Sequence, residues 1–243
     1  MFLANSLVDG FFQSNWIGKG IVLIQLAASV AMVAALLKKG RELSYLKRQT
    51  RMFLDEFAQG GDCLEHYLTR KTGARTGIVA IYRSTCDRLL KLLAPDARAL
   101  LLGRCSVIDG RSTYLTTHEV RLINGTCEHA LDEEEIRVRR GTSFIATIVS
   151  LSPMLGLLGT VWGVLDAFAA MGTAGSANLA TIAPSIASAL VTTVVGLLVA
   201  MPGVAALNKI NSLVDDINSD MEGFADELIG RIACEFQDQG KGA

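Results

Sequence analysis

The sequence predicts an all-α, polytopic membrane protein with three transmembrane helices and a helical cytoplasmic region, with long helices extending from the membrane into the cytoplasm. Two observations support this prediction. Between residues 141 and 208 the one charged residue is Asp166, and a stretch so free of charge is typical of a lipid bilayer rather than of a soluble domain. Near the N-terminus, IVLIQLAASVAMVAALL is a further apolar run of nearly the length that crosses hydrocarbon.

Turn signals and changes in composition divide the chain. The short link GTAGSAN, residues 172 to 178, joins the last two apolar stretches and predicts a helical hairpin. The predicted parts, in order, are a periplasmic segment 1–15, transmembrane helix 16–37, cytoplasmic region 38–140, transmembrane helix 141–172, periplasmic link 173–177, transmembrane helix 178–208, and cytoplasmic C-terminal helix and tail 209–243.

The orientation follows from the basic residues. Lys38, Lys39 and Arg41 follow the first span, Arg139 and Arg140 precede the second, and the hairpin link carries no charge. Because basic residues gather on the cytoplasmic side, we expect the N-terminus and the hairpin tip outside, and residues 38–140 and 209–243 with the C-terminus in the cytoplasm. The N-terminus lacks a basic patch and a cleavage site, so no removable signal peptide is expected.

Helical spacing of apolar residues predicts that the cytoplasmic region is built from helices. The expected helices cover residues 41–57, 78–93 and 112–140. We expect the last of these to run directly into the second span, because only Gly141 interrupts the sequence there. The acidic run 132–135, followed by arginines, is interpreted as a solvated helix with close-range ion pairs.

Several functions find no support in the sequence. A net charge of −1 gives no electrostatic case for binding nucleic acid. The three histidines and the five scattered cysteines do not form a recognisable metal-binding spacing, and no phosphate-binding loop is present. We therefore expect neither an enzyme, nor a metal, nor a cofactor.

Small and hydroxyl residues form stripes along both helices of the hairpin. Residues spaced by i, i+4, i+7 and i+11 share one helix face, and the two stripes are Gly156, Thr160, Gly163 and Ala167, and Ala189, Thr193, Gly196 and Ala200. Ser185, Ser188 and Thr192 place hydroxyls on an adjoining face. Such stripes suit either close helix packing or the wall of an ion pathway, and periodicity alone does not choose between these interpretations.

The sequences GLLGTVWG and AP-x-IA-x-AL-x-x-T-x-x-GL, with their order and spacing over residues 137–211, resemble the ExbB/TolQ/MotA proton-channel family, and most closely its ExbB/TolQ branch. The resemblance implies an ion-channel subunit of a motor complex in a bacterial inner membrane, so that the N-terminus and the hairpin tip would lie in the periplasm. It implies a homopentamer that surrounds an ExbD/TolR-like single-span partner, and an aspartate of that partner carries the ion. It also implies contact with membrane lipid and a further partner, a TonB/TolA-like periplasm-spanning protein.

Carried over by position, the resemblance makes Thr160 and Thr193 the pore threonines. The hydroxyls expected to line the ion pathway are those of Thr160, Thr193, Ser188 and Thr192. The residues expected to pack against the partner helix are Gly156, Gly163, Ala167, Ala189 and Gly196.

Two positions depart from the family pattern. Ser188 stands where ExbB and TolQ proteins usually carry glutamate, and a hydroxyl cannot take up and release a proton at physiological pH. This leaves open a sodium-driven member of the family or a membrane scaffold that does not conduct.

Asp166 stands where relatives commonly have histidine or asparagine. Counting along the helix puts Asp166 at the outer end of the hydrocarbon, so we expect a polar rim residue rather than an ion relay.

Overall fold

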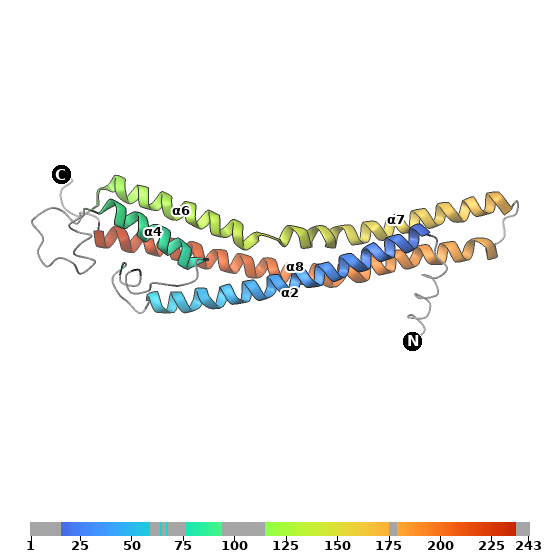
Figure 1. Ribbon diagram of the computed structural model, residues 1–243, viewed down its shortest axis with the longest axis horizontal. Helices are drawn as coiled ribbons and strands as arrows, with labels where there is room; N and C mark the ends of the chain where they lie inside the picture. Colours follow the sequence, from blue (N-terminus) through green and yellow to red (C-terminus); the bar gives the residue numbers. More distant parts are fainter. Residues whose placement is uncertain are drawn as a thin grey trace, which may run out of the picture. The chain divides into compact units, whose positions relative to one another are not determined.

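The computed structural model confirms the all-α class. It describes residues 16–58, 64, 67, 76–93, 115–174 and 179–236. The helices are α2 (Trp16–Ala58), α4 (Ile78–Leu92), α6 (Thr117–Arg139), α7 (Thr142–Ala174) and α8 (Leu179–Phe236) (Figure 1). The apolar residues of the first and third predicted spans thus lie in helices that continue well beyond them, 43 residues long in α2 and 58 in α8.

The chain forms two compact units. The first combines Met1–Arg41 with Gly141–Ser212, and the second combines Glu42–Arg140 with Leu213–Ala243. Helices α2 and α8 each contribute to both units, whereas α7 belongs to the first, and α4 and α6 belong to the second.

The first unit holds the hairpin of α7 and the beginning of α8, with the beginning of α2 beside them (Figure 1). Glycines allow the helices to approach closely. A Cβ atom added to Gly156 on α7 would lie 2.9 Å from the Cα atom of Thr193 on α8. One added to Gly203 on α8 would lie 2.7 Å from the sulfur of Met32 on α2. Small residues bring membrane helices together in this way.

Three helical stretches of the described residues are long and apolar enough to cross a membrane. They lie within Trp16–Ala58, Thr117–Thr173 and Ile182–Phe236, and their best windows have mean hydropathies of 2.4, 1.9 and 2.2. Only 22%, 28% and 28% of these windows is buried inside the chain. Because so much apolar surface faces outward, it requires lipid or other protein chains to cover it.

The second unit has an aromatic core. The rings of Phe53 and Phe57 on α2, Tyr82 on α4 and Phe224 on α8 lie with centroids between 5.2 and 6.4 Å apart. The guanidinium of Arg231 covers Phe57 at 4.3 Å from the ring centroid. Large buried aromatic side chains and their mutual contacts dominate the energetics of such cores.

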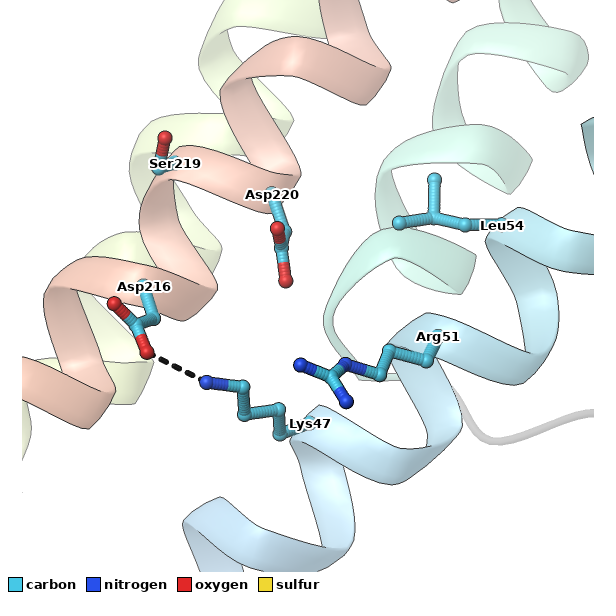
Figure 2. Close-up of a pocket in the computed structure, with 6 residues that line it drawn as sticks. All are labelled: Lys47, Arg51, Leu54, Asp216, Ser219 and Asp220. Carbon is cyan, nitrogen blue, oxygen red and sulfur yellow. Dashed lines mark hydrogen bonds and ion pairs between the residues drawn. The ribbon is translucent and has the colours of Figure 1, made fainter.

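Charged side chains line the surface between α2 and α8 in this second unit. Figure 2 shows Lys47 and Arg51 of α2 reaching toward Asp216 and Asp220 of α8, around a hollow of about 290 Å³. Lys47 Nζ lies 2.6 Å from Asp216 Oδ2. The Asp216 side chain is 54% exposed, so solvent screens this ion pair and it contributes little to stability.

The expectation that one helix runs directly from the region 112–140 into the second span is wrong. Helix α6 ends at Arg139 and α7 begins at Thr142. Gly141 has φ +91°, a backbone conformation outside the helical range that residues with a side chain rarely adopt. A Cβ atom there would meet nothing within 4 Å, so backbone conformation rather than space favours glycine.

The acidic run is not fully solvated, contrary to expectation. Glu134 is 4% exposed, and its Oε2 accepts a hydrogen bond of 2.7 Å from the backbone N–H of Gly77. Its Oε1 accepts a hydrogen bond from Arg137. This carboxylate therefore ties α6 to the start of α4 inside the second unit.

Candidate functional site

Hydroxyl groups of α8 bond to the backbone of α7 along the hairpin. Thr193 Oγ1 donates to the carbonyl oxygen of Gly156 at 2.8 Å. Thr192 Oγ1 lies 3.2 Å from the same carbonyl and 2.7 Å from that of Ala189 on its own helix. Gly156 has no side chain, so its backbone is accessible to both hydroxyls. The structure thus brings together three of the predicted site residues, Gly156, Thr192 and Thr193.

The predicted small-residue positions are occupied within the chain itself. Gly163 faces Ala189, with a Cβ atom on Gly163 lying 3.2 Å from the Cα atom of Ala189. Ala167 and Ala189 are each 2% exposed. Gly196 faces the carbonyl of Ser152, which a Cβ atom would approach to 2.6 Å. These positions pack α7, α8 and α2 together, and packing against a partner helix stays a prediction.

The other predicted pathway residues lie elsewhere along the hairpin. Thr160 is partly exposed, and its hydroxyl donates to the carbonyl of Leu157 in its own helix at 2.7 Å. Ser188 is buried, 6% exposed, one turn before Thr192. Asp166 is partly exposed on α7, and its rim role stays a prediction.

Sequence reasoning missed Gln25, which lies in the first predicted span and is completely buried. Its Nε2 donates to the carbonyl of Ser152 on α7 at 3.2 Å and to that of Thr192 on α8 at 3.3 Å. The available signal was an amide within the otherwise apolar run IVLIQLAASV, because a polar residue in a span normally faces other protein groups.

The chemistry available along the hairpin is that of neutral oxygen atoms. A threonine hydroxyl that donates its hydrogen to a carbonyl keeps lone pairs that can accept a hydrogen bond or contact a cation. Hydroxyls and carbonyls do not hold a proton at physiological pH, so a titrating group would have to come from elsewhere. Among the residues that the structure describes, no cluster of His, Cys, Asp and Glu could hold a metal ion.

The class of the protein follows from these features. It is a multi-pass helical membrane protein with three membrane-compatible helical stretches, two of which form a closely packed hairpin joined by hydroxyls and glycines. Comparison with known families makes this specific. Residues 107–223 match the MotA/TolQ/ExbB proton channel family.

Individual relatives agree with this match. The chain is 30% identical over 228 residues to the Tol-Pal system protein TolQ of Haemophilus influenzae, covering 92% of each chain. It is 29% identical to the Tol-Pal system protein TolQ of Pseudomonas aeruginosa, over 86% of this chain and 84% of that one. It is 45% identical over 69 residues to the biopolymer transport protein ExbB of Salmonella typhimurium, 28% of each chain. The chain belongs to the MotA/TolQ/ExbB proton channel family, as its sequence motifs predict.

Proposed function

We propose that this chain is the ion-conducting subunit of an inner-membrane complex that couples ion-motive force, carried by protons, to work by a periplasmic or outer-membrane machine. The observation that carries the proposal is the bonding of Thr193 to Gly156 across the α7–α8 hairpin. It places a hydroxyl within the stretch 141–208, in which Asp166 is the one charged residue. The relatives' names, a Tol-Pal system protein and a biopolymer transport protein, support work on the cell envelope.

A partner chain supplies the titrating group in this proposal. The hydroxyl oxygens available here can receive a proton or cation in passing but cannot store a proton. A single-span ExbD/TolR-like protein with a membrane aspartate would provide that storage. Holding a charged aspartate at mid-bilayer costs about 2.5–3.5 kcal/mol on insertion scales, so its protonation changes its preferred surroundings. A potential of about 100 mV supplies roughly 2.3 kcal/mol for each charge that crosses.

The outward-facing apolar surface supports the proposed assembly. Leu157 and Leu165 on α7 and Leu190 on α8 are 62%, 60% and 57% exposed in the single chain. A homopentamer surrounding the partner helix would cover part of this surface, and lipid would cover the rest. The proposed orientation places the N-terminus in the periplasm and the C-terminus in the cytoplasm.

The test is replacement of Thr160 and of Thr193 by valine, which keeps the shape of the side chain and removes the hydroxyl. We expect each variant to assemble and to lose ion flow, measured as acidification of proteoliposomes that hold the complex and an enclosed pH-sensitive dye. Thr173→Val, near the exposed end of α7, is the control matched to Thr160→Val, because the hydroxyls of both threonines bond to carbonyls of their own helix. Full ion flow in both test variants would contradict the proposal.

Ser188 favours a second candidate function. This buried hydroxyl occupies a position where the family resemblance implies glutamate. A sodium-driven member of the family, or a scaffold that does not conduct, would need no carboxylate there. Vesicles with a sodium gradient and an enclosed sodium-sensitive dye, compared with the proton-gradient vesicles, separate the alternatives. Flow with sodium alone indicates the former, and no flow with either ion indicates the latter.

A further inference from the structure

Gln25 is the polar link between α2 and the hairpin. Its side chain is 0% exposed, and its amide nitrogen carries two hydrogens, enough for one bond to Ser152 on α7 and one to Thr192 on α8. One side chain thus joins the three helices of the first unit. In surroundings without water, no solvent molecule competes for these hydrogen bonds.

The neighbouring backbone is shaped to admit this amide. Gly196 lies one turn after Thr192, and a Cβ atom on Gly196 would lie 2.8 Å from Gln25 Nε2 and 2.6 Å from the carbonyl oxygen of Ser152. Any larger residue at position 196 would push the glutamine away or separate α7 from α8. The glycine and the glutamine therefore fit each other.

The link acts on the residue next to the proposed pathway threonine. The carbonyl of Thr192 accepts from Gln25, while the hydroxyl of Thr192 bonds to Gly156 and Ala189. Thr193 follows directly and donates to Gly156. Thr192 is therefore held by α2 through its carbonyl and by α7 through its hydroxyl, so a change at Gln25 should shift the Thr193 hydroxyl that follows it.

An amide is a costly choice for simple space filling. Gln25 Oε1 is buried and accepts no hydrogen bond from any group that the structure describes. A buried acceptor without a partner lowers stability, and a leucine or methionine would avoid that loss. The donor bonds to the two carbonyls are what the amide adds.

We propose that Gln25 is a positioning residue for ion transfer, one that fixes Thr193 by tying α2 to both helices of the hairpin. This inference rests on the proposed function. Small displacements of groups that handle a reacting species can lower a rate by up to about a hundredfold. Loss of the link should therefore reduce ion flow by more than the accompanying loss of stability would explain.

The experiment compares three variants in the complex purified from its native membrane and reconstituted in vesicles of phosphatidylethanolamine and phosphatidylglycerol. Gln25→Met keeps the length and removes both donor hydrogens. Gln25→Asn keeps the two donor hydrogens on a side chain that is one methylene shorter. Met32→Ala is the matched control, since Met32 is 2% exposed on the same helix and packs beside Gly203 of α8.

We expect Gln25→Met to lower proton flux by at least about tenfold, Gln25→Asn to restore part of it, and Met32→Ala to keep its flux despite lower thermal stability. Equal flux in Gln25→Met and the wild type would overturn the inference. So would losses in all three variants that simply follow thermal stability, because the glutamine would then be structural.

The result is separable from the test of the proposed function. If Thr160→Val and Thr193→Val lose flux while Gln25→Met keeps it, the channel function stands and the positioning role fails. If the two valine variants keep full flux, the proposed function itself fails, whatever the Gln25 variants do.

Discussion

At the scale of single residues, Glu134 is a buried carboxylate whose two oxygens both accept hydrogen bonds. The carboxylate is 4% exposed, yet it accepts from the backbone of Gly77 and from Arg137. Gly77 itself has φ +63°, and a Cβ atom there would lie 2.8 Å from Cδ1 of Leu46. The carboxylate thus bonds to the backbone of a turn at the start of α4 whose conformation and close approach to Leu46 suit glycine.

We predict that Glu134→Ala destabilises the second unit by about 1–3 kcal/mol, because the N–H of Gly77 then loses its partner in a buried site. Chemical denaturation of the detergent-solubilised protein, followed by far-UV circular dichroism, measures this loss. Glu133→Ala is the control: its side chain is 66% exposed beside His129, so a change within about 0.5 kcal/mol is expected. Equal effects of both substitutions would show that burial of Glu134 is unimportant.

At the scale of elements, the start of α6 is fixed by a reciprocal cap. The backbone N–H of Thr116 donates to Glu119 Oε2 at 2.8 Å, and the N–H of Glu119 donates to Thr116 Oγ1 at 3.3 Å. The bonds from the Thr116 backbone and side chain lower the pKa of the Glu119 carboxyl from its ordinary value of 4.5.

A group whose pKa is lowered on folding stabilises the fold most fully above its unfolded pKa. The contribution of Glu119 is therefore complete above about pH 4.5 and disappears as the pH falls through the lower folded value. We predict that Thr116→Ala costs about 1 kcal/mol at neutral pH and weakens the pH dependence of unfolding in this acid range. Thr126→Ala, an exposed site within the same helix, should leave the pH dependence unchanged.

A second carboxyl group, that of Glu135 on α6, affects the pH dependence of stability in the opposite direction to Glu119. Burial, then the nearby carboxylates of Glu222 on α8 and Asp132, raise the pKa of Glu135 on α6. An acid with a raised folded pKa makes the protein less stable as the pH rises through that value. The pairing of α6 with α8 thus carries a like-charge repulsion at neutral pH, beside the attraction of Arg139 to Asp215 at 3.3 Å.

At the scale of the whole molecule, the exposed apolar helices and the distribution of basic residues make orientation the property most open to test. We predict that Gly172→Cys, an exposed site at the end of α7, reacts with a membrane-impermeant maleimide in spheroplasts. The exposed native Cys234 should react only after the membrane is permeabilised. Each cysteine is tested in a variant that lacks the other cysteines. Labelling of Cys234 in intact spheroplasts would show that the orientation is the opposite of the predicted one.

Much of the whole molecule follows from the sequence alone. The spans, the helical class and the family are determined by the absence of charge between 141 and 208 apart from Asp166, and by the motifs around Thr160 and Thr193. These features are local, since a residue's polarity and its spacing on a helix do not depend on distant segments. The same periodicity grouped Gly156 with Thr160 on one helix and Thr193 with Gly196 on the other, but it did not predict that Gly156 and Thr193 meet.

Only the tertiary structure decided which faces meet, and what lies between them. Gln25 belongs to a span whose periodicity says nothing about the carbonyls of Ser152 and Thr192, more than a hundred residues away. The acidic run predicts that Glu134 is solvated, whereas in the folded chain it is buried and accepts a hydrogen bond from the backbone of Gly77, just before α4. Helix spacing determines how residues share a face of one helix, whereas hydrogen bonds between helices depend on distances that arise only when the chain packs.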